Sequence, residues 1–371
     1  MLLNDNNSGL SERVKKKHLK ELSEYRVGTL RPNPDLHSLF LEVTQDCNEH
    51  CRHCGSRCGD LKNDEPVTLE EWKRVLSEVK RDFDISKIRL CITGGEPLLY
   101  KDFFELVNFA DSLGFKWGMT SNGTLITREI AGRLRAANMK TVSVSVDGLR
   151  ESHEWFRQSP GSFDKTIEGI KNLLEENFFK HVQVTTVVHH ENFHELDDMY
   201  IFFSKLGIRS WRVINIEPIG RAKDNPELML SEDELRGLIY FIEDHRFKNK
   251  MEVLYGCSHY LGTEHEREVR PWYFLCNAGV YTASIQNNGN ISACLDIERR
   301  RELIEGNIRK DNLKRVWEEG FKIYRSDFRK EGKCKDCSEY PYCAGDSFHT
   351  WNFDKMEPEL CMYEVMKNWR I

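Results

Sequence analysis

Between residues 37 and 221 the chain alternates between two hydrophobic patterns. Short apolar runs rich in β-branched residues predict six strands, at 38–44, 87–93, 115–120, 140–146, 182–188 and 210–216. Apolar residues that recur every three or four positions predict helices between them, at 101–113, 127–137, 163–177 and 193–206, with an earlier helix opening at Thr68. Strands and helices that alternate in this way form a parallel sheet with helices outside, so we predict an α/β fold.

The first predicted helix carries a start signal. Thr68 and Glu71 have the spacing of a capping box. The apolar residues that follow share one helical face: Leu69, Trp72, Val75, Leu76 and Val79. Parallel sheets hold their ligands at the carboxyl ends of the strands, so we expect functional residues directly after the strands.

The two ends of the chain differ from this middle part. The N-terminal residues are polar and basic, which predicts a solvated arm or a short helix. One more helix is expected at 231–245, and from Cys276 onward regular patterns give way to cysteines, which is typical of a domain organised by bound metal. The expected division is an N-terminal extension (1–36), a sheet domain (37–235), a connecting helical segment (236–275) and a cysteine-rich domain (276–371).

Composition narrows the class of protein. The chain has 371 residues and a formal net charge of −6, which argues against a mainly electrostatic nucleic-acid binder. Hydrophobic residues make up 39% and charged residues 31%, proportions that allow a sizeable globular core. No run approaches the ~18 apolar residues of a membrane span, and the opening apolar stretch is too short for a secretory signal. We therefore expect a cytoplasmic protein without a membrane or nucleic-acid partner.

Twelve cysteines are the main chemical feature of the sequence. In a reducing compartment, spaced cysteines point to metal or cluster ligands rather than to disulfides. Three of them, Cys47, Cys51 and Cys54, follow the first strand directly. Three thiolates on a tight loop suit an iron–sulfur cluster that keeps one iron open. The alternative is a zinc site completed by His50, His53 or Cys58.

This CxxxCxxC loop resembles the signature of the radical S-adenosylmethionine (SAM) superfamily. One strand later, Gly94, Gly95 and Glu96 resemble the GGE motif of that family. Two glycines let the backbone approach a ligand closely, and the glutamate is an acceptor for an ammonium group. The resemblance runs from about His37 to the end of the chain. It implies a partial (β/α)6 radical SAM barrel followed by a small cysteine-rich domain.

Three later strand ends match places that contact SAM in the resembled family. The residues that the resemblance assigns to SAM are Ser121, Asn122, Ser145, Asp147 and Arg157. Hydroxyls and carboxylates suit a ribose diol, and a guanidinium suits a carboxylate. Each residue alone is explained equally well as a turn residue or a helix cap. The segment 217–221 resembles the end of the family's barrel, and the sequence gives it no role.

The C-terminal cysteines resemble the SPASM or twitch extension found on many radical SAM enzymes. The spacing from Cys276 to Gly289 and Cys294 resembles the opening of that extension. By this resemblance, an outer [4Fe-4S] cluster takes Cys334, Cys337, Cys343 and Cys361. An inner cluster takes Cys276 and Cys294, but Ser347 stands where the family has a further cysteine.

The departure at Ser347 leaves the ligands of the inner cluster open. Cys257 is a candidate third ligand, and Ser347, His349 or the substrate are candidates to complete the set. A single twitch-like cluster that uses Cys276, Cys294 and part of the later group is a second arrangement. Zinc in this domain is a third, because CxxC pairs bind zinc well.

Three further residues lie outside these sets. Cys91, on the second strand, is interpreted as a small core residue, and Cys58 as a loop thiol. Asp296, two residues after Cys294, is a candidate catalytic base. Some relatives carry an acid near that position, but immediately after the cysteine.

The resemblance implies chemistry that belongs to the cofactors. A reduced [4Fe-4S] cluster cleaves SAM to methionine and a 5′-deoxyadenosyl radical, which takes a hydrogen atom from the substrate. We expect a flavodoxin- or ferredoxin-type electron donor and one or two auxiliary clusters. Because the extension most often accompanies peptide-modifying enzymes, we expect a ribosomally made peptide or protein as substrate, changed by cross-linking, thioether formation, epimerisation or oxidation. The alternatives are a small-molecule oxidase or dehydrogenase and a non-enzymatic, zinc-stabilised binding protein.

Overall fold

The computed structural model of the chain describes residues 10–60, 65–246, 248 and 250–367. Its main element is one ten-stranded sheet with the order β10-β9-β8-β1-β2-β3-β4-β5-β6-β7. The strands are β1 (Ser38–Glu42), β2 (Arg89–Thr93), β3 (Lys116–Ser121), β4 (Thr141–Ser145), β5 (His181–Val188), β6 (Ser210–Asn215), β7 (Glu252–Tyr255), β8 (Thr282–Ile285), β9 (Asn290–Ser292) and β10 (Gly306–Asn307). All neighbours from β8 through β1 to β7 pair in parallel, which confirms the predicted α/β fold.

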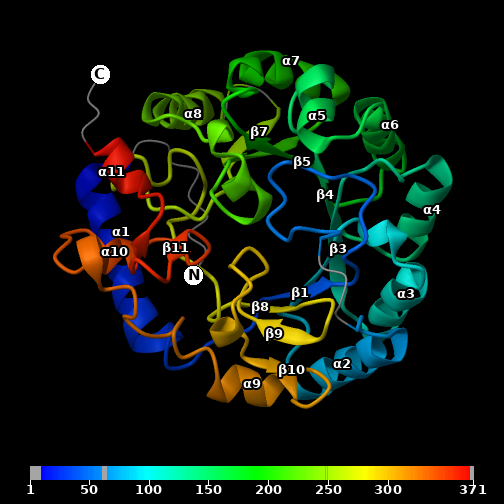
Figure 1. Cartoon of the computed structure of the whole chain (residues 1–371), viewed down its shortest axis with the longest axis horizontal. Helices are drawn as coiled ribbons and strands as arrows, with labels where there is room; N and C mark the ends of the chain where they lie inside the picture. The colour runs from blue at the N-terminus through cyan, green and yellow to red at the C-terminus, as the bar shows by residue number, and fades with distance from the viewer. Residues whose placement is uncertain (1–9, 61–64, 247, 249, 368–371) are drawn as a thin grey trace.

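Helices surround this sheet, which curves into a barrel that is not closed (Figure 1). The helices of the barrel are α2 (Leu69–Asp82), α3 (Phe103–Leu113), α4 (Arg128–Ala136), α5 (Arg150–Arg157), α6 (Ser162–Glu175), α7 (Leu196–Leu206) and α8 (Glu232–His245). Each helix predicted in this region forms, and α5 is an additional one. The helix α5 has only eight residues, and most of them are polar, so hydrophobic periodicity does not predict it from the sequence.

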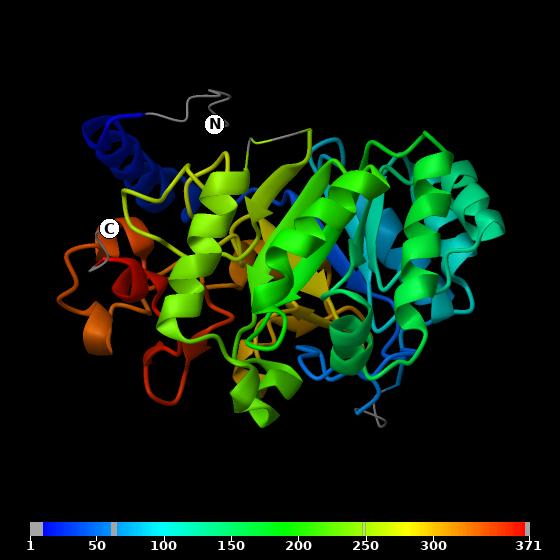
Figure 2. The same ribbon diagram turned by 90° about the horizontal axis from the view of Figure 1, so that it is seen from above.

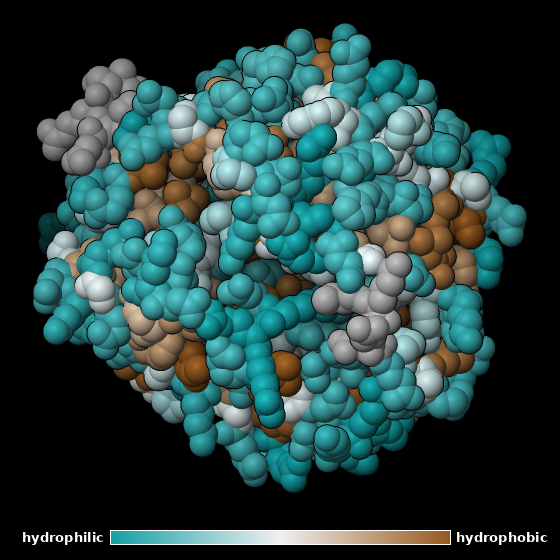
Figure 3. All heavy atoms as spheres, viewed as in Figure 1, coloured by the Kyte–Doolittle hydropathy of each residue, from teal (hydrophilic) through white to brown (hydrophobic). Residues whose placement is uncertain are grey.

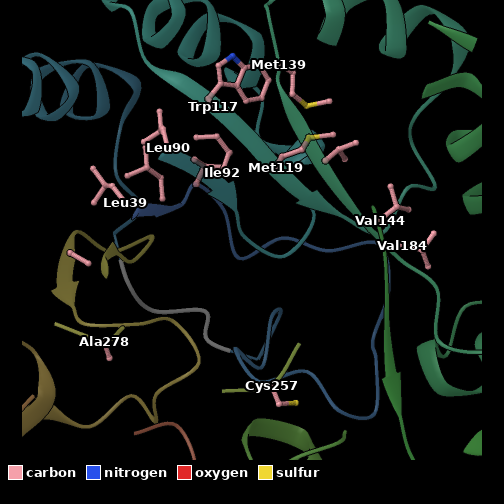
Figure 4. Close-up of a cluster of buried hydrophobic side chains, with 14 of the residues drawn as sticks. Leu39, Leu90, Ile92, Trp117, Met119, Met139, Val144, Val184, Cys257 and Ala278 are labelled. Carbon is pink, nitrogen blue, oxygen red and sulfur yellow. The ribbon is translucent and has the colours of Figure 1, made fainter. Parts of the chain in front are cut away.

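Local sequence signals account for the ends of several elements. The predicted capping box is present at α2, where Thr68 accepts from the backbone of Glu71 and Glu71 accepts from that of Thr68. The helix α3 ends at Gly114, whose φ of 96° lies in the left-handed region that glycine adopts without strain. The core forms where apolar strand residues meet the helices. Leu39, Ile92 and Trp117 are among its fully buried members (Figure 4).

The N-terminal extension includes a helix with one buried face. After α1 (Glu12–Tyr25) comes a π-helical turn at Arg26–Leu30. Leu19 packs in a small apolar cluster with Tyr260 and Phe274. The predicted helix therefore forms, but it is docked rather than solvated on all sides. Residues 1–9, which contain the opening apolar stretch, lie outside the described ranges.

Beyond the sixth strand the sheet continues further than the pattern indicated. The segment 236–275, expected to be helical, is helical only to His245 and then forms β7, which extends the sheet beside β6. In the cysteine-rich part, β8 pairs in parallel with β1 and begins the β8–β9–β10 end of the sheet. Both edges of the predicted six-stranded sheet are thus covered, since exposed strand edges are unfavourable.

The remaining C-terminal elements are short: α9 (Leu313–Glu319), α10 (Tyr340–Cys343), β11 (Trp351–Asn352), β12 (Glu357–Pro358) and α11 (Met362–Met366). Of these, α9 packs against α2 (Figure 1), and the later ones gather at the end of the molecule that carries the N-terminal helix (Figure 2). The helix α10 contacts α1, and α11 contacts α8. Within the described residues, no helix is both long enough and apolar enough to cross a membrane.

Candidate active site

The loop that carries Cys47, Cys51 and Cys54 begins after β1 and is tied to the end of β2. Backbone N–H groups of Gly95 and Glu96 donate to the carbonyl oxygens of residues 44 and 46, both at 2.8 Å. A Cβ on Gly94 would lie 2.5 Å from the oxygen of residue 44, and one on Gly95 would lie 2.2 Å from that of residue 46. Only glycine fits at these two positions, because the backbone after β2 touches the backbone at the start of the cysteine loop.

The segment after β6 holds the same loop from another side. Arg221 is buried, and it donates from Nε to the carbonyl of Cys51 (2.9 Å) and from Nη1 to that of Cys58 (3.1 Å). Its backbone N–H donates to the carbonyl of Cys54 at 3.0 Å. A Cβ on Gly220 would lie 2.2 Å from that same oxygen. This contact gives the 217–221 segment a role that the sequence did not provide.

The three thiols of the loop lie in surroundings that suit a metal cluster. Cys51 is buried, whereas Cys47 and Cys54 are half-buried. Burial raises the pKa of Cys47 to about 11 and also raises the pKa of Cys51, while contact with the Cys58 side chain lowers the pKa of Cys54. Buried thiolates need positive charge beside them, which the irons of a cluster supply. The donor set therefore fits an iron–sulfur cluster.

The two histidines of the zinc alternative have other contacts. His50 is exposed, and its Nε2 lies 3.4 Å from Oδ1 of Asp60. The ring of His53 stacks on Phe156 with a centroid distance of 4.4 Å and an interplanar angle of 2°. Burial lowers the pKa of His53 to about 4, so this imidazole is neutral. His50 thus has a carboxylate partner and His53 a stacking partner, while Nδ1 of His53 has no hydrogen-bond partner among the described residues.

Glu96 joins the ends of β2 and β3. Oγ of Ser121 donates to both carboxylate oxygens (2.9 and 3.1 Å), and the backbone N–H of Asn122 donates to Oε2 (2.8 Å). Burial raises the pKa of Glu96 to about 7. Asn122 also donates from Nδ2 to Oδ1 of Asn48 in the cysteine loop (2.8 Å). Three residues that were expected to contact SAM therefore form one network beside the cysteines.

Arg157, the last residue of α5, is buried between two carboxylates. Its Nε and Nη2 donate to Oδ2 of Asp147 (3.0 and 2.7 Å), and Nη1 donates to Oε2 of Glu49 (2.7 Å). Two residues assigned to SAM thus bind each other. Glu49, which the sequence reasoning missed, connects them to the cysteine loop, and its position inside CxxxCxxC is the signal that could have found it. Ser145, also assigned to SAM, is half-buried at the end of β4.

Several buried polar atoms beside the cysteines have no hydrogen-bond partner among the described residues. Next to Cys47 they are the side-chain amide of Gln45 and Oε1 of Glu49, and between Cys51 and Cys54 they are Nε of Arg52 and Nδ1 of His53. Leaving such a group unsatisfied costs about 1–3 kcal/mol. Unpaired polar atoms on either side of Cys47 fit a ligand with an amine, a carboxylate and hydroxyls, as SAM has.

The cysteine loop lies inside the ring of helices (Figure 1). The same face of the molecule is largely hydrophilic and is hollowed near its centre, where hydrophobic atoms form the bottom (Figure 3). The hollow is where a substrate can approach the sheet.

The expected auxiliary-cluster cysteines meet in the C-terminal part of the chain. Burial raises the pKa of Cys294, and the nearby Asp296 and Cys276 raise it further. Sγ of Cys294 donates to Oδ2 of Asp296 at 3.7 Å, which places this exposed candidate base beside the thiol. Cys276 and Cys343 line the same small cavity with Arg329. The sets expected for an inner and an outer cluster therefore adjoin, which suits one twitch-like cluster as well as two.

The other cysteines of the expected outer set form two neighbouring pairs. Burial raises the pKa of Cys334, and the adjacent Cys337 adds to that effect. Burial likewise raises the pKa of Cys343, to which Asp346 and Cys361 contribute. All four thiols are half-buried, which leaves them accessible to iron.

The candidates to complete the inner cluster all have protein partners. Cys257 is buried at the end of β7, and its Sγ donates to the carbonyl of Asn215 at 3.8 Å. Ser347 is fully buried, and its hydroxyl donates to a main-chain carbonyl. His349 pairs with Glu217 at 2.6 Å. The ligands of an inner cluster beyond Cys276 and Cys294 stay a prediction.

Comparison with known proteins identifies the class. A family model described as the radical SAM superfamily matches residues 41–203, and the SPASM model, described as an iron-sulfur cluster-binding domain, matches residues 276–338. The AdoMet-dependent heme synthase of Methanosarcina barkeri is 30% identical over 347 residues, 88% of this chain and 96% of that protein. The mycofactocin maturase MftC of Mycolicibacterium smegmatis is 27% identical over 311 residues, 83% of this chain and 76% of that protein.

A solved structure shares the fold. SuiB of Streptococcus suis bound to S-adenosylmethionine superposes with a TM-score of 0.71 at 18% identity, covering 98% of this chain and 84% of that one. The chain belongs to the radical SAM superfamily and carries a C-terminal SPASM domain. These domains imply a SAM-binding [4Fe-4S] cluster and auxiliary iron–sulfur clusters.

Proposed function

We propose that this radical SAM enzyme removes a hydrogen atom from an organic substrate that enters the central hollow, and that Cys47, Cys51 and Cys54 hold the SAM-binding cluster. When bound, the cluster and SAM supply a 5′-deoxyadenosyl radical. The observation that supports this assignment is the meeting of three thiols, the unpaired polar atoms of Gln45 and Glu49, and the Glu96 network at one end of the sheet.

The residues around the cysteines have positioning roles in this proposal. Arg221 and the glycine pair hold the loop in shape, so that the thiols are preorganised for iron. Glu96 is placed to accept a hydrogen bond from the ammonium group of SAM. Arg157 already donates to Asp147 and Glu49, so its first role is to hold these two carboxylates in place. Its remaining N–H groups are assigned to the carboxylate of SAM.

The experiment is SAM cleavage by the anaerobically reconstituted enzyme with a chemical reductant. Replacing Cys47, Cys51 and Cys54 together by Ala should abolish 5′-deoxyadenosine formation while auxiliary iron remains. Cys91→Ala is the matched control, because Cys91 is a half-buried thiol on β2 outside every expected ligand set. Continued cleavage by the triple variant would show that the assignment is wrong.

For the substrate, we propose an iron tetrapyrrole first. The supporting observation is the similarity to a heme synthase over 88% of this chain and 96% of the relative. Another relative is named Fe-coproporphyrin III synthase, and it is 34% identical over 134 residues. This candidate is a form of the small-molecule alternative considered from the sequence.

A peptide substrate is the second candidate, favoured by the similarity to the mycofactocin maturase MftC. The two candidates are separated by offering Fe-coproporphyrin III and, in parallel, a short Gly- or Cys-rich peptide encoded beside the gene. Mass spectrometry of the products and 5′-deoxyadenosine formed above the substrate-free rate identify the substrate. Stimulation by the peptide alone would reject the tetrapyrrole.

We also propose a flavodoxin- or ferredoxin-type electron donor and a cytoplasmic location. All twelve cysteines are unpaired in the structure, as a reducing compartment requires. Reduction of the clusters by a purified flavodoxin, measured as 5′-deoxyadenosine formed without chemical reductant, tests the donor.

A further inference from the structure

Outside the cysteine sites, three side chains from distant parts of the chain meet around one point. Glu217 follows β6, His259 follows β7, and His349 lies beyond α10. Their ligand atoms lie within 4.8 Å of one another. Nε2 of His259 is 2.7 Å from Oε1 of Glu217, and Nε2 of His349 is 2.6 Å from Oε2 of the same carboxylate.

One of these histidines is held rigidly by a further carboxylate. Nδ1 of His259 lies 2.7 Å from Oδ2 of Asp346, and Oδ1 of Asp346 accepts from the backbone N–H of Tyr260 at 3.0 Å. Arg329 donates to the main-chain oxygen of Asp346. A carboxylate on the far nitrogen of an imidazole is the arrangement that orients metal-binding histidines, because it fixes the tautomer and the direction of the ring.

The donor set and the spacing suit a small divalent cation. Two imidazole nitrogens and one carboxylate oxygen form a common catalytic zinc set, which leaves a fourth position for water or a substrate oxygen. Ligands at about 2.0–2.1 Å from a tetrahedral ion are about 3.3 Å apart. The two histidine nitrogens lie 2.6 and 2.7 Å from different oxygens of Glu217, and all three ligand atoms lie within 4.8 Å of one another. Binding an ion therefore requires the side chains to shift until both nitrogens and one carboxylate oxygen reach that spacing.

Access to this point comes from one side. The side chain of His259 is 0% exposed, whereas those of Glu217 and His349 are 8% and 13% exposed. The glutamate is also three residues before Gly220, whose backbone lies against the cysteine loop. The segment 217–220 would therefore connect an ion here to the radical SAM loop, and His349 is the most exposed of its three ligands.

We propose that Glu217, His259 and His349 bind one Zn²⁺ ion, with Asp346 orienting His259, at a site separate from the iron–sulfur clusters. The open fourth position would take a water molecule or a carboxylate or carbonyl oxygen of the substrate. This site does not depend on the identity of the substrate or on SAM cleavage.

The test uses the full chain with its iron–sulfur clusters reconstituted, dialysed against Zn²⁺ and then against metal-free buffer. Elemental analysis should find one zinc per chain, and X-ray absorption at the zinc edge should show nitrogen and oxygen neighbours without sulfur. Sulfur in the zinc shell would place the ion at cysteines and overturn the proposal, as would zinc no higher than the buffer background. Because this measurement needs no variant, it does not depend on how a mutant folds.

Matched variants then identify the ligands. His349→Ala and Glu217→Gln should each weaken zinc binding at least tenfold while the iron of the SAM-binding cluster is unchanged. His265→Ala is the control, since His265 also pairs with a single glutamate, Glu243, at 2.8 Å and its side chain is 14% exposed. Equal zinc affinity in His349→Ala and the wild type would overturn the assignment.

Discussion

Removing the guanidinium of Arg221 is the sharpest test of how the cysteine loop is held. In Arg221→Met, the carbonyls of Cys51 and Cys58 lose their hydrogen bonds of 2.9 and 3.1 Å, and Asp60 loses its ionic partner at 3.1 Å. Hydrogen bonds to a charged group contribute about 1.5–3 kcal/mol each, so the two carbonyls account for about 3–6 kcal/mol. The Asp60 pair adds at most about 1 kcal/mol, because Asp60 is 34% exposed.

At the lower end, about 3 kcal/mol corresponds to a loss of about 100-fold in an equilibrium constant. We expect Arg221→Met to release iron from the SAM-binding cluster about 100-fold more readily, because the loop that holds the three thiols is no longer fixed. The assay is competition for iron with a chelator under anaerobic conditions, followed by 5′-deoxyadenosine formation. The auxiliary clusters should keep their iron.

The control for this prediction is Arg150→Met. Arg150 makes a two-bond pair with Asp164 at 2.5 Å, but its side chain is 53% exposed, so we expect little change. If Arg221→Met retained its iron and its cleavage rate like the control, the loop would not depend on this clamp and the reasoning would be refuted.

Three further predictions follow from the same site. Burial raises the pKa of Glu96 from 4.5 to about 7, so between these pH values the folded state keeps a proton that the unfolded state has lost. The free energy of unfolding should therefore fall by about 3 kcal/mol as the pH rises from 4.5 to 7. Glu96→Gln should flatten that dependence in urea unfolding between these pH values, and an unchanged slope would contradict it. Gly95→Ala should destabilise the protein and impair cluster assembly, since its Cβ would lie 2.2 Å from a backbone oxygen, whereas Gly132→Ala, with its nearest atom at 3.7 Å, should not; equal iron content in the two variants would be the contrary result. Arg157→Ala should cost about 3–5 kcal/mol by leaving two buried carboxylates unpaired, and should also weaken SAM binding measured by equilibrium dialysis. If the free energy of unfolding of Arg157→Ala fell by less than about 1 kcal/mol, burial of the two carboxylates would not depend on Arg157.

Most of the central barrel could be predicted from the sequence, because each of its elements is specified locally. Strands such as Arg89–Thr93 are short apolar runs, and α2 has its own capping box at Thr68. The cysteine loop and Glu96 were found for a related reason, since they directly follow strands and their spacing is short-range.

What the sequence could not show are contacts between segments that are far apart in the chain. Arg221 meets Cys51 across 170 residues, and Glu217 meets His349 across 132. The strands β7 and β8 carry too few residues for a distinct pattern, and they become strands because the edges of the sheet offer unpaired backbone groups. The sequence by itself thus determined the six βα units and the short-range spacing that brings Cys47, Cys51 and Cys54 together on one loop. Only the tertiary structure decided which side chains hold the cysteine loop and which ones gather into the Glu217–His259–His349 site, because long-range packing rather than local periodicity brings those groups together.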